Sequence, residues 1–303
     1  MPDSNNALTN GNMAPRFLVW STNGWIAGKL YRLLQKQCKQ VFLTSTRMED
    51  REAVMQQLTS IKPTHVINAA GCTGRPNVDW CESNKEQTIR SNVIGTLNLA
   101  DCCFQAGIHC TIFATGCIYN YDDAHPIGGP AFTEDDEPNF RGSFYSHTKS
   151  HVQELLKNYQ NCLVLRIRMP TSDDLSPRSF VTKILSYKHI VNIPNSHSIL
   201  HDLLPAALIL AENHETGILN FVNPGAISHN EVLDLFKQVV RPSVTYQNFS
   251  IQEQAKILKA GRSNCELDTQ KLVLKLDKYG LHIPEIHQAY RQCFKRMKAM
   301  GIE

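Results

Sequence analysis

The sequence lacks the segments that would place it in a membrane or mark it for secretion. No apolar run in its 303 residues reaches the length that spans a bilayer. The first residues, MPDSNNALTNGNMAPR, have neither the basic start nor the apolar block of a signal peptide. We therefore expect a flexible tail over residues 1–15 and a cytoplasmic protein that has no membrane partner.

Features that hold metals or bind polyanions are also scarce. The ten cysteines include no C-x-x-C pair, which favours free thiols in a reducing compartment over disulfides or zinc. The formal net charge of +3 is too small to indicate a nucleic-acid partner, although it suits an anionic small molecule. We predict no metal site and no nucleic-acid binding.

The chain does contain a regular alternation of strand and helix patterns. Apolar runs predict strands at residues 17–20, 41–44, 65–68, 110–114 and 163–167, and helical spacing predicts helices at 24–37, 49–60, 88–107 and 146–159. This alternation indicates an α/β fold, a doubly wound parallel sheet with its ligands at the carboxyl ends of the strands. We expect a Rossmann-type domain over 16–170, with a later return near 200–228, and a mainly substrate-binding part over 171–303.

The first strand is followed by WSTNGWIAGKL, a turn with one glycine fewer than a dinucleotide-binding turn has. On the spacing G-x-x-G-x-x-G the three positions are Ser21, Gly24 and Ala27. Gly24 still lets the backbone approach a pyrophosphate at the helix N-terminus. A serine at 21 costs on the order of 1 kcal/mol where the turn needs a positive φ, so we expect cofactor binding to be weakened and not abolished. A strand-turn-helix without a ligand is the alternative at this point.

The end of the second strand lacks the acid that holds the ribose hydroxyls of NAD. TSTRMEDR places Arg47 there, and a guanidinium suits the extra phosphate of NADP; a solvated surface arginine is the alternative. After the third strand, the small residues of NAAGCTG leave room for a cofactor. The predicted cofactor contacts are Ser21, Asn23, Gly24, Trp25, Ile26, Arg47, Ala69, Ala70, Gly71, Asn92, Tyr145 and Lys149.

A hydroxyl, a phenol and an amine follow in an order that fits carbonyl reduction. Thr115 ends the fourth strand in ATGCIY, and YSHTK places Tyr145 and Lys149 on one face of the next helix. The ammonium favours the phenolate by proximity. The phenol can then donate a proton to a carbonyl oxygen that the Thr115 hydroxyl holds. The order and spacing of the three residues, more than the tyrosine–lysine pair itself, indicate a reductase.

Longer strings carry a family resemblance: NAAGCTGRPNVDWCES, ATGCIY, GSFYSHTK, LRIRMP, RSFVTKI, IPNSHSIL, FVNPGAISHNE and EQAKILKAGRSNCELD. On them the chain resembles the extended short-chain dehydrogenase/reductases, and more closely the bifunctional nucleotide-rhamnose synthases. These 3,5-epimerase/4-reductases turn UDP- or dTDP-4-keto-6-deoxyglucose into the corresponding NDP-rhamnose. The resemblance implies NADPH as reductant, Thr115, Tyr145 and Lys149 as the reductase triad, and Cys117 and Lys183 as the epimerase pair.

The chemistry of a 4-keto sugar explains the use of a thiol and an amine. Its C3 and C5 protons are acidic because the carbanion is an enolate, and inversion needs groups on opposite faces to remove and supply a proton. A thiol and an amine of matched pKa do this near neutral pH; read alone, Cys117 would be a core residue and Lys183 an exposed lysine. A 4,6-dehydratase would need an acid and base pair, an Asp-Glu, directly after the threonine, where this chain has Gly116 and Cys117. We therefore expect a dehydratase on a separate chain to supply the substrate.

Polar loops after residue 170 are expected to hold the nucleotide-sugar. Arg262 is the predicted diphosphate cation, with Asn195 and Arg75 as further candidates; an exposed loop residue is the alternative for each. The string SHNE at 228–231 predicts a capping box. Two other functions stay open: a cofactor-binding regulatory or structural protein without catalysis, and a reductase-only nucleotide-sugar enzyme. The sequence decides neither between UDP and dTDP nor the oligomeric state, for which a homodimer is one option.

Overall fold

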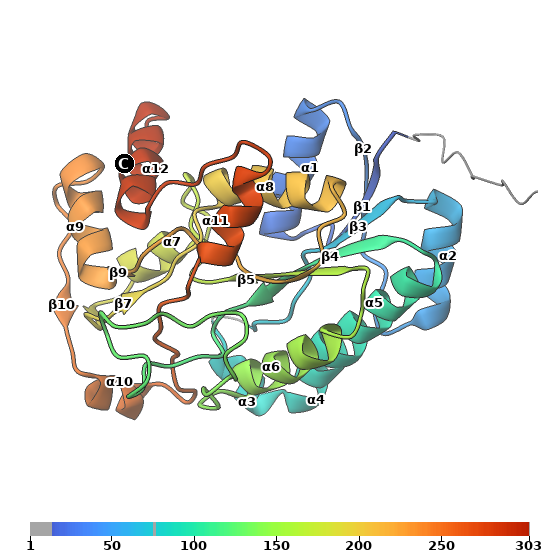
Figure 1. Cartoon of the computed structure of the whole chain (residues 1–303). Coiled ribbons are helices and arrows are strands. Elements are labelled where there is room, and N and C mark those ends of the chain that lie inside the picture. Colours follow the sequence, from blue (N-terminus) through green and yellow to red (C-terminus); the bar gives the residue numbers. More distant parts are fainter. Residues whose placement is uncertain (1–13, 75–76, 303) are drawn as a thin grey trace, which may run out of the picture.

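The computed structural model describes residues 14–74 and 77–302 of the chain (Figure 1). Residues 1–13, which make up most of the predicted tail, lie outside the described residues, and so does Arg75, a predicted substrate contact. Within the described part, no helix is long and apolar enough to cross a membrane. The same residues contain no cluster of His, Cys, Asp or Glu side chains arranged to hold a metal ion.

A six-stranded sheet with the strand order β2-β1-β3-β4-β5-β8 forms the centre of the protein. Its strands are β1 (Arg16–Trp20), β2 (Gln40–Thr44), β3 (His65–Asn68), β4 (His109–Thr115), β5 (Cys162–Ile167) and β8 (Gly217–Asn220). All neighbouring strands are parallel, which confirms the doubly wound parallel sheet predicted from the sequence. The strand order reverses beside β1, and this leaves a crevice at the carboxyl ends of β1 and β3.

Helices cover both faces of the sheet because its strands send alternate side chains to opposite sides. Phe17 and Val19 of β1 belong to one core, and Leu18 and Trp20 belong to the other. The first core is covered by α1 (Trp25–Lys36), α8 (Leu200–Glu212) and α11 (Gln270–Asp277), and the second by α2 (Arg51–Ile61), α5 (Gly95–Gln105) and α6 (Phe144–Leu156). Figure 1 shows the two sets of helices on opposite sides of the sheet.

The helix predicted over residues 88–107 begins earlier and is interrupted. Its pieces are α3 (Asp79–Ser83), α4 (Lys85–Ile89), a π-helical turn (Arg90–Ile94) and α5. The π-helical turn carries the buried Asn92, whose side-chain amide hydrogen-bonds to both the N–H and the carbonyl of Cys72 at 2.8 Å. Turns of this kind often lie at functional sites, and this one holds the loop after β3 in place.

The chain after β5 builds a third core beside the sheet from apolar side chains of α7, α9 and α12. The elements outside the main sheet are α7 (Phe180–Leu185), β6 (His189–Ile190), β7 (Pro194–Asn195), β9 (Ile227–Ser228), α9 (His229–Val239), β10 (Gln247–Asn248), α10 (Ile251–Ile257) and α12 (Ile286–Ala299). Strand β7 pairs with β9, and β6 pairs with β10. Helix α9 begins with the predicted capping box, in which Ser228 and Glu231 each accept the other's backbone N–H.

The turn after β1 holds a serine in a strained conformation. Ser21 has a φ of +98°, a value that residues with side chains rarely adopt, and its N–H donates to the Thr44 carbonyl at 2.9 Å. Gly24, the N-cap residue of α1, lies against this serine. A β-carbon at position 24 would lie 2.5 Å from Ser21 Oγ. The turn therefore has the positive φ that the sequence comparison raised for position 21. The Ser21 side chain fills the space that a side chain at position 24 would need.

Substitutions at positions 21 and 24 are expected to be strongly non-additive. Gly24→Ala should lower the free energy of unfolding by about 1–3 kcal/mol, because its methyl group overlaps the Ser21 side chain. In a Ser21→Gly background the same change should cost less than about 1 kcal/mol, since the next neighbour, Ala27 Cβ, lies at 3.3 Å. Urea unfolding of the single and double variants measures this coupling. Equal losses in both backgrounds would show that the two side chains do not meet.

Candidate active site

A cleft of about 570 Å³ lies at the carboxyl ends of β1, β2 and β3. Five of the predicted cofactor residues line it: Ser21, Asn23, Arg47, Ala70 and Gly71. The lining also includes residues that had not been singled out from the sequence, among them Cys72, Thr73, Trp80 and Arg178. Doubly wound sheets bind dinucleotides in a crevice at this position.

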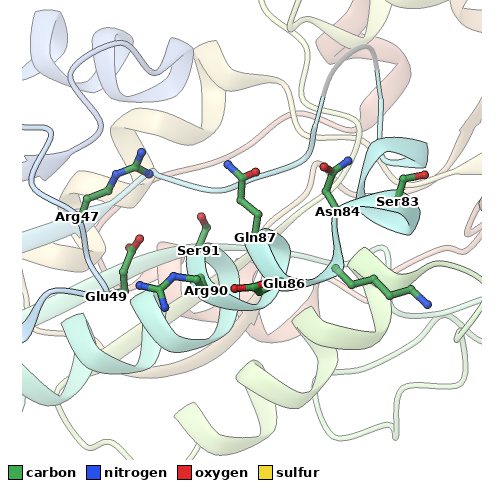
Figure 2. Close-up of a pocket in the computed structure, with 9 residues that line it drawn as sticks. Arg47, Glu49, Ser83, Asn84, Glu86, Gln87, Arg90 and Ser91 are labelled. Carbon is green, nitrogen blue, oxygen red and sulfur yellow. The ribbon is translucent and has the colours of Figure 1, made fainter.

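The cleft continues past the end of β2 into a second hollow of about 580 Å³ (Figure 2). Arg47, Glu49, Gln87 and Ser91 line both hollows, so the two form one groove. Figure 2 shows Arg47 and Glu49 on the loop after β2, and Arg90 on the helical segment that faces it. Among the described residues, neither Arg47 nor Arg90 forms an ion pair, whereas three other arginines do. Both guanidinium groups are therefore available to an anionic ligand.

Three other predicted cofactor residues do not line the cleft and pack against the core instead. Ile26 and Ala69 pack against the core beneath α1. The Trp25 indole N–H donates to Asp174 at 3.2 Å, and Asp174 also pairs with Lys29 at 2.6 Å. These contacts attach the start of α1 to the segment between β5 and α7.

The structure brings the predicted reductase residues together at the carboxyl end of β4. The Thr115 hydroxyl accepts the Cys117 N–H at 3.0 Å, and the Thr115 carbonyl accepts a hydrogen bond from Gln153 at 2.8 Å. The phenol of Tyr145, at the start of α6, lies near enough to Thr115 for the hydroxyl to lower its pKa. Lys149 lies one turn further along this helix and is 3% exposed. Because β4 neighbours β3, these residues lie next to the cofactor cleft.

Burial dominates the electrostatics of the tyrosine and the lysine. Burial and the nearby thiols of Cys117 and Cys81 raise the pKa of Tyr145, against the effect of the Thr115 hydroxyl. Lys149, which was expected to stabilise the phenolate, has a smaller effect on that pKa than these groups. Burial lowers the pKa of Lys149 to about 8. The phenol is therefore neutral near pH 7 and carries the proton that carbonyl reduction requires.

The two predicted epimerase residues come from different elements. Cys117 is half-buried on the loop after β4 and is close enough to affect the Tyr145 phenol. Lys183 lies on α7, where burial and then the positive charge of Arg178 lower the pKa of its amine. No hydrogen bond links Cys117 to Lys183 in the described part of the chain.

A buried arginine that the sequence analysis did not single out holds the loop of Cys117. Arg168, directly after β5, is 1% exposed and donates to the Gly116 carbonyl at 3.1 Å and to Ser263 Oγ at 2.7 Å. Position 116 has no room for a side chain, because a β-carbon would lie 2.5 Å from Leu267 and 3.0 Å from the Arg168 stem. The sequence could have indicated this residue, because LRIRMP places two arginines in an apolar string. A charge in a buried strand needs polar partners.

The same guanidinium engages Asn195, a predicted substrate contact. Asn195 is fully buried, and its Oδ1 accepts hydrogen bonds from Arg168 and from the Cys265 N–H. Its Nδ2 donates to Asn264 at 3.0 Å. The Asn195 amide is thus used inside the protein, and its contact with a substrate stays a prediction.

Arg262, the other predicted substrate contact within the described residues, is also occupied. It pairs with Asp79 of α3 at 2.9 Å and donates to the Ala260 carbonyl at 2.7 Å. The pair attaches the loop after α10 to α3. A neutralised arginine attracts a diphosphate less than a free one does. The diphosphate contact of Arg262 stays a prediction.

Known proteins share much of this sequence. It matches the RmlD substrate binding domain family over residues 15–190. It is 53% identical, over 84% of this chain and 86% of the relative, to the bifunctional dTDP-4-dehydrorhamnose 3,5-epimerase/dTDP-4-dehydrorhamnose reductase of Arabidopsis thaliana. It is 52% identical to the trifunctional UDP-glucose 4,6-dehydratase/UDP-4-keto-6-deoxy-D-glucose 3,5-epimerase/UDP-4-keto-L-rhamnose-reductase RHM1 of the same plant, over 85% of this chain but 39% of the relative.

Solved structures share the fold. The L780 UDP-rhamnose synthase from Acanthamoeba polyphaga mimivirus superimposes with a TM-score of 0.87 at 38% identity, over 93% of this chain and 99% of that chain. A dTDP-4-dehydrorhamnose reductase from Bacillus anthracis, solved in complex with NADP, gives a TM-score of 0.78 at 17% identity over the same shares, a likeness that shows the fold alone. With its family match covering more than half of the sequence and relatives above 50% identity, the chain belongs to the RmlD substrate-binding-domain family.

Proposed function

We propose that this protein is an NADPH-dependent 3,5-epimerase/4-reductase that converts UDP- or dTDP-4-keto-6-deoxy-D-glucose to the corresponding NDP-L-rhamnose. The observation that carries the proposal is the convergence of Thr115, Cys117 and Tyr145 at the end of β4, beside the groove. The names of the Arabidopsis relatives support it, since they describe a 3,5-epimerase and a reductase acting on dTDP or UDP sugars, and L780 is named a UDP-rhamnose synthase. A cytoplasmic location and a homodimer stay predictions from the sequence alone.

The groove suits NADP by its position and its charges. The Ser21–Gly24 turn lies at the N-terminus of α1, where a pyrophosphate is stabilised by backbone N–H groups. Arg47 lies after β2, where this fold holds the adenosine ribose of the cofactor, and it has no ion-pair partner among the described residues. Bound there, NADPH supplies the hydride for C4 of the sugar.

Reduction of the C4 ketone needs a proton at the oxygen as well as the hydride at the carbon. Tyr145, neutral near pH 7 because burial raises its pKa, is placed to donate that proton. The Thr115 hydroxyl is placed to hold the same oxygen while its charge develops. Lys149 favours the phenolate that remains once a proton has left.

Epimerisation uses the same C4 oxygen but exchanges protons at carbon. Removing the C3 or C5 proton moves the electron pair onto the C4 oxygen, and the enolate that forms is held by Thr115 and Tyr145. Cys117, two residues after Thr115, and Lys183 on α7 are the proposed groups for the two faces of the ring. Burial and the charge of Arg178 lower the pKa of Lys183 toward the range of a general base.

We further propose that a 4,6-dehydratase on another chain supplies the 4-keto substrate. Dehydration needs an acid beside the threonine that ends β4, and the backbone there is packed closely as Gly116 and Cys117. A dehydratase portion forms part of the names of the trifunctional relatives, of which this chain spans 39%. Addition of a separate dehydratase and an NDP-glucose to this protein should therefore be required for product to form from that sugar.

Arg47→Ala should raise the KM for NADPH about tenfold or more while leaving the KM for NADH nearly unchanged. The reason is that only NADPH carries the phosphate that the guanidinium would bind. Steady-state reduction with each cofactor measures the ratio. Arg32→Ala, which removes an exposed arginine on α1 away from the groove, is the control. Equal effects on both cofactors would make Arg47 a surface residue.

Cys117→Ala and Tyr145→Phe should separate the two half-reactions. Cys117→Ala should abolish solvent deuterium incorporation at C3 and C5 without weakening NADPH binding, because the thiol exchanges protons at carbon only. Tyr145→Phe should slow reduction severely, because the proton donor is lost. Some exchange should persist at a lower rate, because the enolate loses one hydrogen bond. NMR of the sugar nucleotide in deuterated water follows both. The control is Cys38→Ala, which removes an exposed thiol; exchange at the parent rate in Cys117→Ala would refute the epimerase assignment.

Lys149→Met should stabilise the protein at neutral pH although it impairs reduction. Burial lowers the pKa of Lys149 to about 8 in the folded state, against about 10.4 in an unfolded chain, so below pH 8 folding must bury a charge. Below pH 8 the gain in unfolding free energy should be about 2–3 kcal/mol, and it should shrink as pH rises from about 8 to 10.4. Urea unfolding across that pH range measures it. A difference that does not change with pH would show that the folded ammonium is solvated.

A further inference from the structure

Arg178 places a guanidinium on the wall of the cofactor cleft. The residue lies between β5 and α7 and is exposed, and it lines the cleft together with Ser21, Thr22 and Asn23 of the turn after β1. Its NH1 donates to the Thr73 hydroxyl, on the loop after β3, at 3.4 Å. The side chain therefore reaches from the segment that leads into α7 to the loop after β3, which lines the cleft.

The carboxylates nearest to Arg178 in the sequence are engaged elsewhere. Asp173 pairs with Arg296 at 3.1 Å, and Asp174 pairs with Lys29 at 2.6 Å. Within residues 14–74 and 77–302, no carboxylate forms an ion pair with Arg178. An unpaired guanidinium on the wall of a cleft is a donor set for an anionic ligand.

The distribution of charge along the cleft matches a ligand with two anionic groups. The described lining contains two basic side chains, Arg47 and Arg178, and one acidic side chain, Glu49. An NADP molecule carries a 2′-phosphate and a pyrophosphate. In this fold the 2′-phosphate lies at the end of β2, near Arg47, and the pyrophosphate lies at the turn after β1. Arg178 shares the cleft with that turn, so each arginine faces a different anionic group.

We propose that Arg178 binds the diphosphate of the cofactor and closes the cleft over it from the side of α7. The inference rests on the proposed function in one respect, that the ligand of the cleft is a dinucleotide. A nucleotide-sugar carries the same diphosphate group, and Arg178 lies five residues before Lys183. The cofactor is the assigned source because the turn at Ser21–Asn23 lines the same cleft as Arg178.

The test compares Arg178→Ala with Arg47→Ala, using calorimetric titrations to measure the affinities for NADP⁺, NAD⁺ and UDP. Arg178→Ala should weaken the binding of NADP⁺ and of NAD⁺ by the same factor, about tenfold, because both contain the pyrophosphate. Arg47→Ala should weaken NADP⁺ alone. Arg178→Lys should recover part of the affinity, since a point charge remains without the planar fork of donors. Arg291→Ala, an exposed arginine on α12 outside the cleft, is the matched control and should change nothing.

Three results would overturn the assignment. A loss of UDP affinity with NADP⁺ and NAD⁺ unchanged would assign Arg178 to the diphosphate of the substrate. Unchanged affinity for all three ligands would make Arg178 a surface cation. A loss for NADP⁺ that exceeds the loss for NAD⁺ would assign it to the 2′-phosphate. Failure of the proposed function itself would appear differently, as absence of NADP⁺ and NAD⁺ binding in the unsubstituted protein.

Discussion

The buried guanidinium of Arg168 is the contact on which the site depends, because it joins segments that lie far apart in the chain. Its hydrogen-bond acceptors are neutral and come from other elements: the Gly116 carbonyl, the Ser263 hydroxyl and the Asn195 amide. Among the described residues no carboxylate pairs with it. A buried positive charge without a counter-ion is unfavourable by itself. It also favours an anion that forms nearby, such as an enolate held at the end of β4.

A single oxygen position explains why two reactions can share one site. Both need the C4 oxygen of the sugar to accept negative charge, and the proposed holders of that oxygen are the Thr115 hydroxyl and the nearby Tyr145 phenol. Cys117 follows Thr115 on the same loop, so the strand that positions the hydroxyl also positions the thiol. The segment after β5 contributes Arg178 to the cleft lining and carries Lys183 on α7.

Local patterns in the sequence predict the features that local physics decides. Apolar runs located the sheet strands up to β5, and the spacing of the turn after β1 indicated the positive φ of Ser21. The occupied amide of Asn195 and the ion pair of Arg262 depend on partners that only folding brings near: Arg168 is 27 residues from Asn195, and Asp79 is 183 residues from Arg262. The π-helical turn escaped prediction because one extra residue hardly disturbs the apolar period of a helix.

The central claim is that one site both inverts and reduces a 4-keto nucleotide-sugar. The most direct measurement is incubation of the protein with UDP- or dTDP-4-keto-6-deoxyglucose and NADPH in deuterated water, followed by NMR of the product. The account predicts an NDP-L-rhamnose with deuterium at C3 and C5, and NADPH consumed in equal amount. A reduced sugar of unchanged C3 and C5 configuration without deuterium would contradict it, because the Cys117–Lys183 side of the site would then have no role in proton exchange.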